Sequence, residues 1–307
     1  MSAGVDSGPD AGTDATTRFF EPGSVSWKVI GHPVALIGGL RALIIQTMHP
    51  LAMAGVAQYS DFRRDPLKRL RGTSAYVASV VFGDRETALA AAARVKKVHE
   101  RVRGIDPVTG KQFSADDPET MLWVHCTEVH SFLAAYRAYA GHLTHAERDR
   151  YLAEQVVAAE LIGLPRAMVP DSVASYRRYF ADVRPQLCVS DTATATIDFV
   201  ARPRLSARTA LDLRLAAWTF GPAAVAIVPR DLRRLGGLPE RSRRELPLRA
   251  INNVAWRVAP LLGHLPVLST VLDGWAIRMV GETTVKLALH QVRARDPRVG
   301  SRPRSHR

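Results

Sequence analysis

Apolar residues recur every three to four positions along almost the whole chain, and this helical period constrains the fold more than any other feature. Strand-type alternation is confined to residues 106–117, where Pro107, Gly110 and the surroundings of Phe113 predict a small hairpin or an extended loop. No strand–helix–strand unit is visible. The pattern therefore predicts an all-α fold, a multi-helix bundle with at most one small β-hairpin.

Capping residues mark the start of several expected helices. Asp65 and Asp84 are suitable N-caps for helices over residues 66–82 and 85–103. Thr144 followed three residues later by Glu147 is a capping box for a helix that runs to residue 162. Further helices are expected over residues 33–47, 51–59, 118–140, 172–183, 207–217, 249–261 and 267–292.

The composition suits one globular body. The chain has 307 residues, of which 47% are hydrophobic and 23% charged, enough to bury one large core. Residues 1–18 are expected to be a disordered leader, because they lack hydrophobic periodicity. They also lack the basic start and the apolar run of a secretory signal. Residues 293–307 are expected to be a disordered basic tail, which leaves residues 19–292 as a single helical domain.

The net charge of +13 is concentrated in residues 230–249 and 293–307. Such charge attracts nucleic acid or anionic lipid headgroups. No nucleic-acid-binding module is recognisable, so we expect no specific nucleic acid partner. A coding bias towards arginine, or weak attraction to anionic lipid headgroups in a peripheral membrane contact, is the better interpretation. A helical protein that binds nucleic acid through its tail is the alternative.

Several classes of protein are excluded. Two cysteines, Cys126 and Cys188, supply neither a disulfide framework nor four ligands for zinc or an iron–sulfur cluster, and this usage is typical of the cytoplasm. The glycine-rich dinucleotide and phosphate-binding motifs and the G-x-S-x-G motif are absent. No apolar stretch reaches the roughly 20 residues of a membrane span. A Ser/His/Asp or Cys/His triad stays open, since its members need not be adjacent in sequence.

His99 falls on the apolar stripe of its expected helix, four residues after Val95 and three before Val102. An imidazole that points into a core needs a partner for each ring nitrogen. A metal ion is one such partner, and a backbone carbonyl is the alternative. Spacing alone leaves both interpretations open.

Arg69 and Thr73 lie four residues apart and therefore share one helix face, which Tyr76 continues. A guanidinium and a hydroxyl on a half-buried face can bind a carboxylate or orient bound oxygen. The alternative is an interhelical salt bridge and a surface threonine.

His125 shares an inward face with Leu122 and Val129. Glu128, three residues later, raises the alternative of a carboxylate-bridged di-iron bundle. That site requires Glu-x-x-His in two helices and two further glutamates, whereas this chain has the reverse order once. His49, directly before a proline, is expected to cap a turn.

Five segments in this order resemble the latex-clearing/MpaB-like oxygenase family. They are MHPLAMAGVAQYSDFRRDP around His49, RLRGTSAYVASVVFG around Arg69 and Thr73, VKKVHERVRG around His99, the DP…LWVH block ending at His125, and the helix after Thr144. The resemblance spans about residues 27–199 and extends towards residue 292. Each segment is weak alone, and the ordered set is specific.

The resemblance implies a globin-like helical bundle around a b-type haem, in a family whose members oxidise or cleave isoprenoid-like chains with O2. By the family's motifs, His99 is the proximal ligand of the haem iron, and Arg69 and Thr73 lie near the haem and take part in catalysis. His125 is expected beside the cofactor, where it orients the site. The expected partners are thus haem b, O2 and a hydrophobic alkene.

One position departs from the family's pattern. Rubber-cleaving members carry a lysine as a distal ligand just before the threonine, and this chain has Gly72 there. The sixth iron position is therefore expected to be open, bound to water or closed by another group, and rubber cleavage itself is not implied. A non-enzymatic haem or lipid carrier is the alternative function. The residues expected to line an apolar pocket for the alkene are Val77, Val80, Val81 and Leu122.

Overall fold

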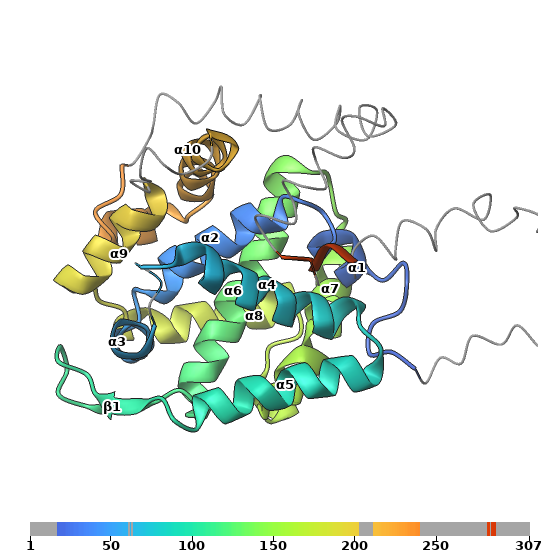
Figure 1. The fold of residues 1–307 in the computed structure, drawn as a ribbon, viewed down its shortest axis with the longest axis horizontal. Coiled ribbons are helices and arrows are strands. Elements are labelled where there is room, and N and C mark those ends of the chain that lie inside the picture. Colours follow the sequence, from blue (N-terminus) through green and yellow to red (C-terminus); the bar gives the residue numbers. More distant parts are fainter. Residues whose placement is uncertain are drawn as a thin grey trace, which may run out of the picture.

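The computed structural model describes residues 17–60, 62, 64–202, 211–239, 281–282 and 284–286. In this part of the chain the fold is all-α with one two-stranded hairpin, as the periodicity predicts (Figure 1). The elements in order are α1 (Val25–Ile30), α2 (Ala35–Gln46), α3 (Pro50–Tyr59), α4 (Pro66–Phe82), α5 (Arg85–His99), β1 (Arg103–Ile105), β2 (Gln112–Ser114), α6 (Pro118–Tyr139), α7 (His145–Ile162), η1 (Arg166–Met168), α8 (Val173–Val183), η2 (Arg184–Gln186), α9 (Asp191–Ala201), α10 (Leu211–Ala226) and α11 (Arg230–Leu235).

Helix α6 runs through the middle of the molecule, and α2 packs closely along it (Figure 1). The approach is close because Gly38 of α2 has no side chain. A Cβ atom there would lie 2.9 Å from the Cα atom of Phe132 and 3.0 Å from the carbonyl oxygen of Ser131. Backbone packed on backbone gives α6 a fixed position between the other helices.

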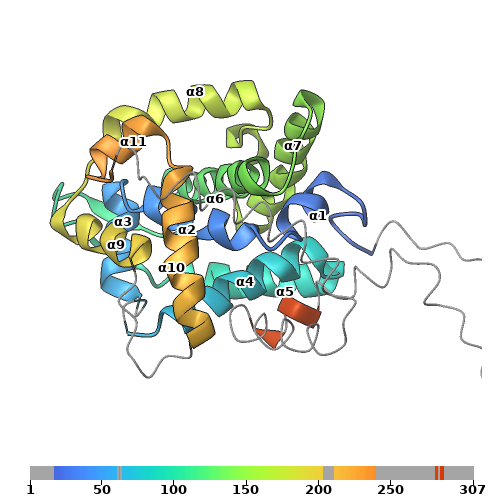
Figure 2. The ribbon, with the colours of Figure 1, turned by 90° about the horizontal axis from the view of Figure 1, so that it is seen from above.

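Buried side chains form two core clusters that both include α6. One core cluster joins α1, α4, α6, α7 and α8, and the other joins α2, α6, α9, α10 and α11. Figure 2 shows α2 and α6 between α4 and α5 on one side and α8 and α11 on the other. Helix α6 therefore presents side chains to two separate environments.

The predicted caps are confirmed. The Asp65 side chain accepts a hydrogen bond from the backbone N–H of Lys68 at 2.9 Å, and Asp84 accepts one from Thr87 at 2.8 Å. Thr144 and Glu147 form the complete capping box. These caps satisfy backbone groups that would otherwise have no partner at the start of each helix.

Helix α5 ends earlier than predicted, at His99 rather than near residue 103. The chain turns there because residues 103–105 pair antiparallel with residues 112–114, with Gly104 opposite Phe113. Val102 is therefore not on the helical stripe of His99, and its side chain lies next to Gly55 of α3. The hairpin itself is confirmed, with its first strand beginning three residues before the predicted segment.

Three described helices were not predicted: α1, α9 and α11. Two of them are six residues long, too short for a helical period to show. Helix α10 continues to Ala226, through Pro222, beyond the end expected at residue 217. The leader, the tail, the helix expected over residues 249–261 and most of the one over residues 267–292 lie outside the described residues.

No single described helix is long and apolar enough to cross a membrane. Helices α2 and α3 would meet the length and composition criteria only as a pair, and the pair is bent by 108°.

We expect Gly38→Ala to lower the free energy of unfolding by about 1 to 3 kcal/mol, because the methyl group forces α2 away from α6. The matched control is Gly39→Ala, where a Cβ atom meets nothing within 4 Å. That variant is expected to keep the parent stability or gain up to about 1 kcal/mol from its higher helix propensity. Urea unfolding of the two variants checks this, and equal stabilities would contradict the close approach.

Candidate active site

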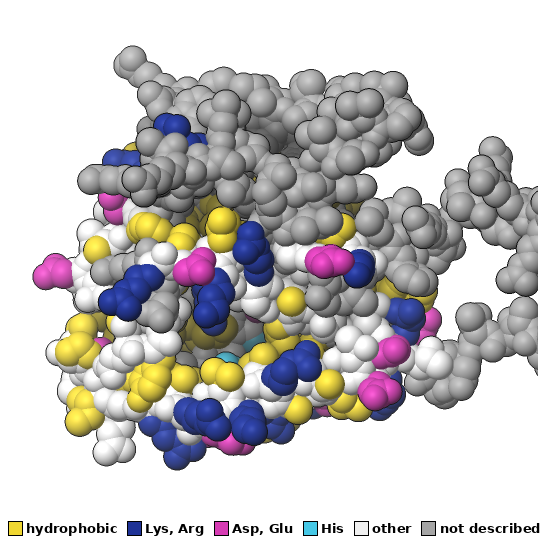
Figure 3. Space-filling view, in the orientation of Figure 1, with side chains coloured by type: hydrophobic (Ala, Val, Ile, Leu, Met, Phe, Trp, Pro, Cys, Tyr) yellow, Lys and Arg dark blue, Asp and Glu magenta, His cyan; other side chains and the backbone are white. Residues whose placement is uncertain are grey.

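Helices α4 and α5 lie side by side and bring three of the predicted site residues to one region (Figure 2). Arg69 and Thr73 are on α4, and His99 is the last residue of α5. Figure 3 shows the surface hollowed between these two helices, with histidine side chains visible in the hollow. The hollow is the candidate active site.

His99 is half-buried and makes no hydrogen bond through its ring among the described residues. Its Nδ1 atom is fully enclosed without a partner, whereas its Nε2 atom retains accessible surface. Burial lowers the pKa of His99, the positive charge of Arg69 lowers it further, and Asp116 opposes the shift. The imidazole is therefore neutral at pH 7 and has an open nitrogen, which is the state that binds a metal.

Arg69 and Thr73 both keep exposed surface. Burial nevertheless lowers the pKa of Arg69, and the negative charge of Glu128 opposes the shift. Arg69 is thus accessible to solvent and also closely surrounded by protein atoms, as expected for a side chain in an open hollow. Arg69 acts electrostatically on both His99 and Glu128, so the three groups lie in one neighbourhood.

Helix α6 adds His125 and Glu128 from the side that faces α4. His125 is 7% exposed, its Nε2 atom is buried without a hydrogen-bond partner, and burial lowers its pKa to about 4. Burial raises the pKa of Glu128 to about 7, against the opposing charge of Arg69. Sequence reasoning considered Glu128 only as an iron ligand, and it missed the electrostatic interaction with Arg69 because these residues are 59 positions apart.

The position of the family's distal lysine is open space in this chain. A Cβ atom built on Gly72 meets nothing within 4 Å, and the residue is exposed. A larger side chain would therefore fit at this position without a steric clash, whereas glycine contributes no side chain.

The expected apolar pocket is not open in the structure. Val80 and Val81 are 2% exposed and Leu122 is 6% exposed, and all three belong to a packed core cluster, with Val77 against it. The prediction that these side chains line a substrate pocket is therefore wrong for the described structure, because they already pack against one another.

His49 is confirmed as a capping residue. Its side chain accepts a hydrogen bond from the backbone N–H of Ala52 at 3.5 Å, at the start of α3. Its ring lies 5.8 Å from that of Trp123, centroid to centroid. The residue supports the fold next to α6.

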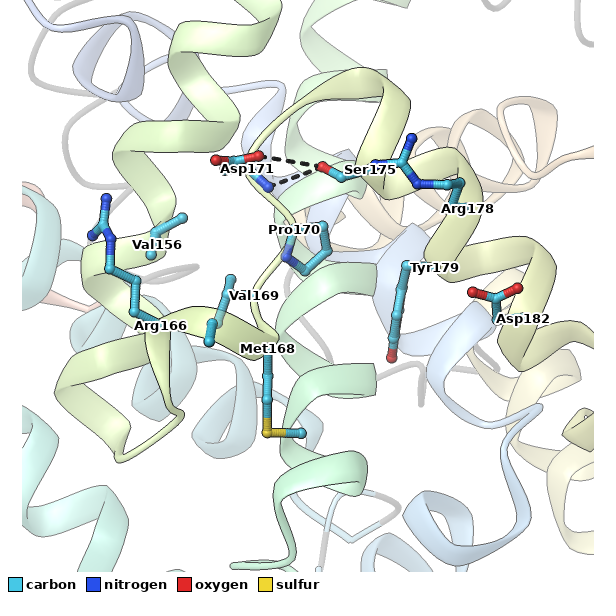
Figure 4. Close-up of a pocket in the computed structure, with 11 residues that line it drawn as sticks. Val156, Arg166, Met168, Val169, Pro170, Asp171, Ser175, Arg178, Tyr179 and Asp182 are labelled. Atoms are coloured by element: carbon cyan, nitrogen blue, oxygen red, sulfur yellow. Dashed lines mark hydrogen bonds between the residues drawn. The ribbon is translucent and has the colours of Figure 1, made fainter.

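Two further cavities lie away from His99. One, of about 760 Å³, lies between η1 and α8, where Tyr179, Met168 and the hydrogen-bonded pair Asp171 and Ser175 line it (Figure 4). The other, of about 410 Å³, contains Arg41 and His130. Sequence reasoning did not single out Arg41 as a functional residue. Its position could have indicated a buried charge, because it is the one charged residue in the apolar segment of residues 34–48.

The described residues contain no group of three or more His, Cys, Asp or Glu side chains that could hold a metal ion. The di-iron alternative therefore finds no ligand set in this part of the chain. Cys126 and Cys188 are both free thiols, and burial raises the pKa of each. Neither thiol has the low pKa of a reactive cysteine.

The chain matches the family model described as "ER-bound oxygenase mpaB/B'/Rubber oxygenase, catalytic domain" over residues 27–257. This match covers more than half of the chain, so the chain belongs to that family of oxygenase catalytic domains. The family predicted from the five ordered segments is confirmed. Comparisons with curated proteins and with solved structures found no match.

We expect Glu128→Gln to stabilise the haem-free protein at pH 8 and to change little at pH 5. The folded pKa of about 7 lies above the ordinary value of 4.5, so folding favours the protonated carboxyl and stability falls as pH rises between these values. Partial exposure screens part of the effect, so the gain at pH 8 is about 1 to 3 kcal/mol. Thermal unfolding across this pH range measures it.

Glu160→Gln is the control, since Glu160 is exposed on α7 and forms a surface ion pair with Arg166. It is expected to leave the pH profile of the parent unchanged. A Glu128→Gln profile parallel to the parent's would contradict the buried-carboxyl interpretation.

Proposed function

We propose that this chain is a haem b-dependent oxygenase that uses O2 to oxidise or cleave a hydrophobic, isoprenoid-like alkene. The observation that carries the proposal is the neutral imidazole of His99. Its Nε2 atom is accessible and has no hydrogen-bond partner among the described residues, and Arg69 lies near it in the hollow between α4 and α5. Membership of an oxygenase family supports it. The haem, the residue roles and the substrate class are the proposed part.

The residues present fit a haem. His99 offers an imidazole nitrogen without a hydrogen-bond partner, as a proximal ligand requires. Arg69 offers a cation in the same hollow, where it pairs with a carboxylate of the cofactor or stabilises negative charge that develops during the reaction. Bound haem would supply the iron chemistry that activates O2.

The other residues orient and assist. Thr73, one helical turn after Arg69, has a hydroxyl on the same face that can donate a hydrogen bond to a bound group. His125 stays neutral because of its burial, and its unpartnered Nε2 atom makes it a positioning residue for groups in the hollow. Glu128, when ionised, attracts Arg69 electrostatically.

A haem or lipid carrier without enzymatic activity is the second candidate. The packing of Val80, Val81 and Leu122 into the core favours a haem carrier over an alkene oxygenase, because the described structure lacks the expected apolar pocket for an alkene. The same packing gives no support to a lipid carrier, which needs apolar space too. O2 uptake by the haem-loaded protein with an alkene distinguishes the two, since a carrier consumes none.

We expect the full chain, produced with a supply of haem, to show a Soret absorbance band, and His99→Ala to lower haem affinity by at least about tenfold. The control is His142→Ala, an exposed histidine outside the hollow, which is expected to keep the parent spectrum. A parent protein that never takes up haem, or a His99→Ala variant with parent affinity, would sink the proposal.

Gly72→Lys is expected to fold and to shift the Soret band of the haem-loaded protein. The site has open space for the side chain, and the family's lysine at this position is a distal ligand. Replacing a glycine inside a helix also favours folding by up to about 1 kcal/mol. Gly39→Lys, likewise at an uncrowded helical glycine, is the control and is expected to leave the spectrum unchanged. Identical spectra for the two variants would argue against a haem beside Gly72.

A further inference from the structure

The cavity of about 410 Å³ lies on the side of α6 turned away from the candidate active site. Trp123, Thr127 and His130 contribute to it from α6, whereas His125 and Glu128 project from the opposite face of the same helix. Helices α8 and α11 close its other side (Figure 2). This cavity is separate from the hollow between α4 and α5.

Arg41 is the charged group inside the cavity, and its residue is only 1% exposed. Its guanidinium donates to the carbonyl oxygen of Ile227 at 2.9 Å, to the hydroxyl of Ser131 at 2.6 Å and to Nδ1 of His130 at 3.4 Å. All three partners are neutral, and no carboxylate among the described residues pairs with it. Two of its five N–H groups have no hydrogen-bond partner among the described residues.

A buried cation without an anion is costly, because burial removes its hydration and nothing of opposite charge replaces it. Burial lowers the pKa of Arg41 to about 9, so the group still carries its charge at pH 7. The two other charged side chains of the cavity, Arg184 and Asp231, form an ion pair with each other. The cavity therefore has a net positive charge from Arg41.

His130 supplies a second donor. Arg41 can only donate, so Nδ1 of His130 accepts its hydrogen bond and the ring proton resides on Nε2. Burial and the charge of Arg41 lower the pKa of His130 to about 3, so the ring stays neutral. Its Nε2 atom retains accessible surface and makes no hydrogen bond among the described residues.

The other walls of the cavity are mainly apolar, formed by Ile45, Trp123, Phe180, Leu187 and Leu232. A volume of 410 Å³ lies in the range of small-molecule sites. One water molecule occupies roughly 30 Å³ in the liquid. If each non-hydrogen atom of a ligand takes a similar volume, the cavity holds about 10 to 15 such atoms. The cavity thus combines one buried cation, a neutral donor and apolar walls.

We propose that this cavity binds a small amphipathic carboxylic acid, with its carboxylate on Arg41 and His130 and its hydrocarbon chain against Phe180 and Leu187, which keep accessible surface. The chemistry favours a carboxylate, because its negative charge compensates the buried guanidinium and its two oxygens can accept from unpaired N–H groups of Arg41 and from Nε2 of His130. An aliphatic chain of about ten carbons fits the remaining volume. The site does not depend on the proposed haem function.

The test is isothermal titration calorimetry of the full chain with decanoate and with 1-decanol. We expect decanoate to bind with a Kd in the micromolar range and decanol at least about tenfold more weakly, since only decanoate neutralises Arg41. Arg41→Gln is expected to abolish the preference for the acid. Equal affinities for the two ligands, or no binding of decanoate, would overturn the proposal.

A second pair of variants avoids the buried arginine, whose replacement can impair folding. Ala181→Phe fills the cavity from its exposed rim on α8 and is expected to weaken decanoate binding at least about tenfold. Ala174→Phe, exposed on the same helix but outside both cavities, is the control and is expected to bind as the parent does. Unchanged binding by Ala181→Phe places the ligand elsewhere and refutes the assignment. Haem uptake is expected to be unaffected by Ala181→Phe.

Discussion

The contact between α2 and α6 is the packing on which the rest of the structure depends. Gly38 lets the two helices meet backbone to backbone at Phe132 and Ser131. With α6 held in this way, each of its faces has a defined environment: His125 and Glu128 towards α4, and Trp123, Thr127 and His130 towards α8 and α11. One helix therefore serves two sites with different chemistry.

Charges without full compensation characterise both sites. In the hollow, Arg69 and Glu128 act on each other, and the carboxyl keeps a raised pKa because burial outweighs the attraction. In the cavity, Arg41 has only neutral partners among the described residues. Such groups cost stability, and proteins commonly retain them where a ligand or a reaction uses the charge.

The sequence predicted the long capped helices closely, and α4 begins and ends where Asp65 and Gly83 indicate. Local signals suffice there, because a cap and a period lie within one segment. The short helices and the end of α5 were not predictable, since pairing between residues 103–105 and 112–114 decides where that helix stops. His99, Arg69 and Thr73 were predicted as site residues from family motifs, and their roles stay predictions. The closeness of Glu128 to Arg69 and the buried partners of Arg41 depend on tertiary contacts that no local pattern records.

His99 is the last residue of its helix, and a hairpin begins four residues later at Arg103. The backbone of His99 is thus joined to the regular helix α5 on one side and to a short connection, residues 100–102, on the other. Changes of length or sequence in that connection are expected to move the imidazole relative to α4, and neither core cluster contains a residue of the hairpin. Relatives with the same helices and different hairpins would then differ in the depth and tilt of this ring, a means of diversifying reactivity on a conserved frame.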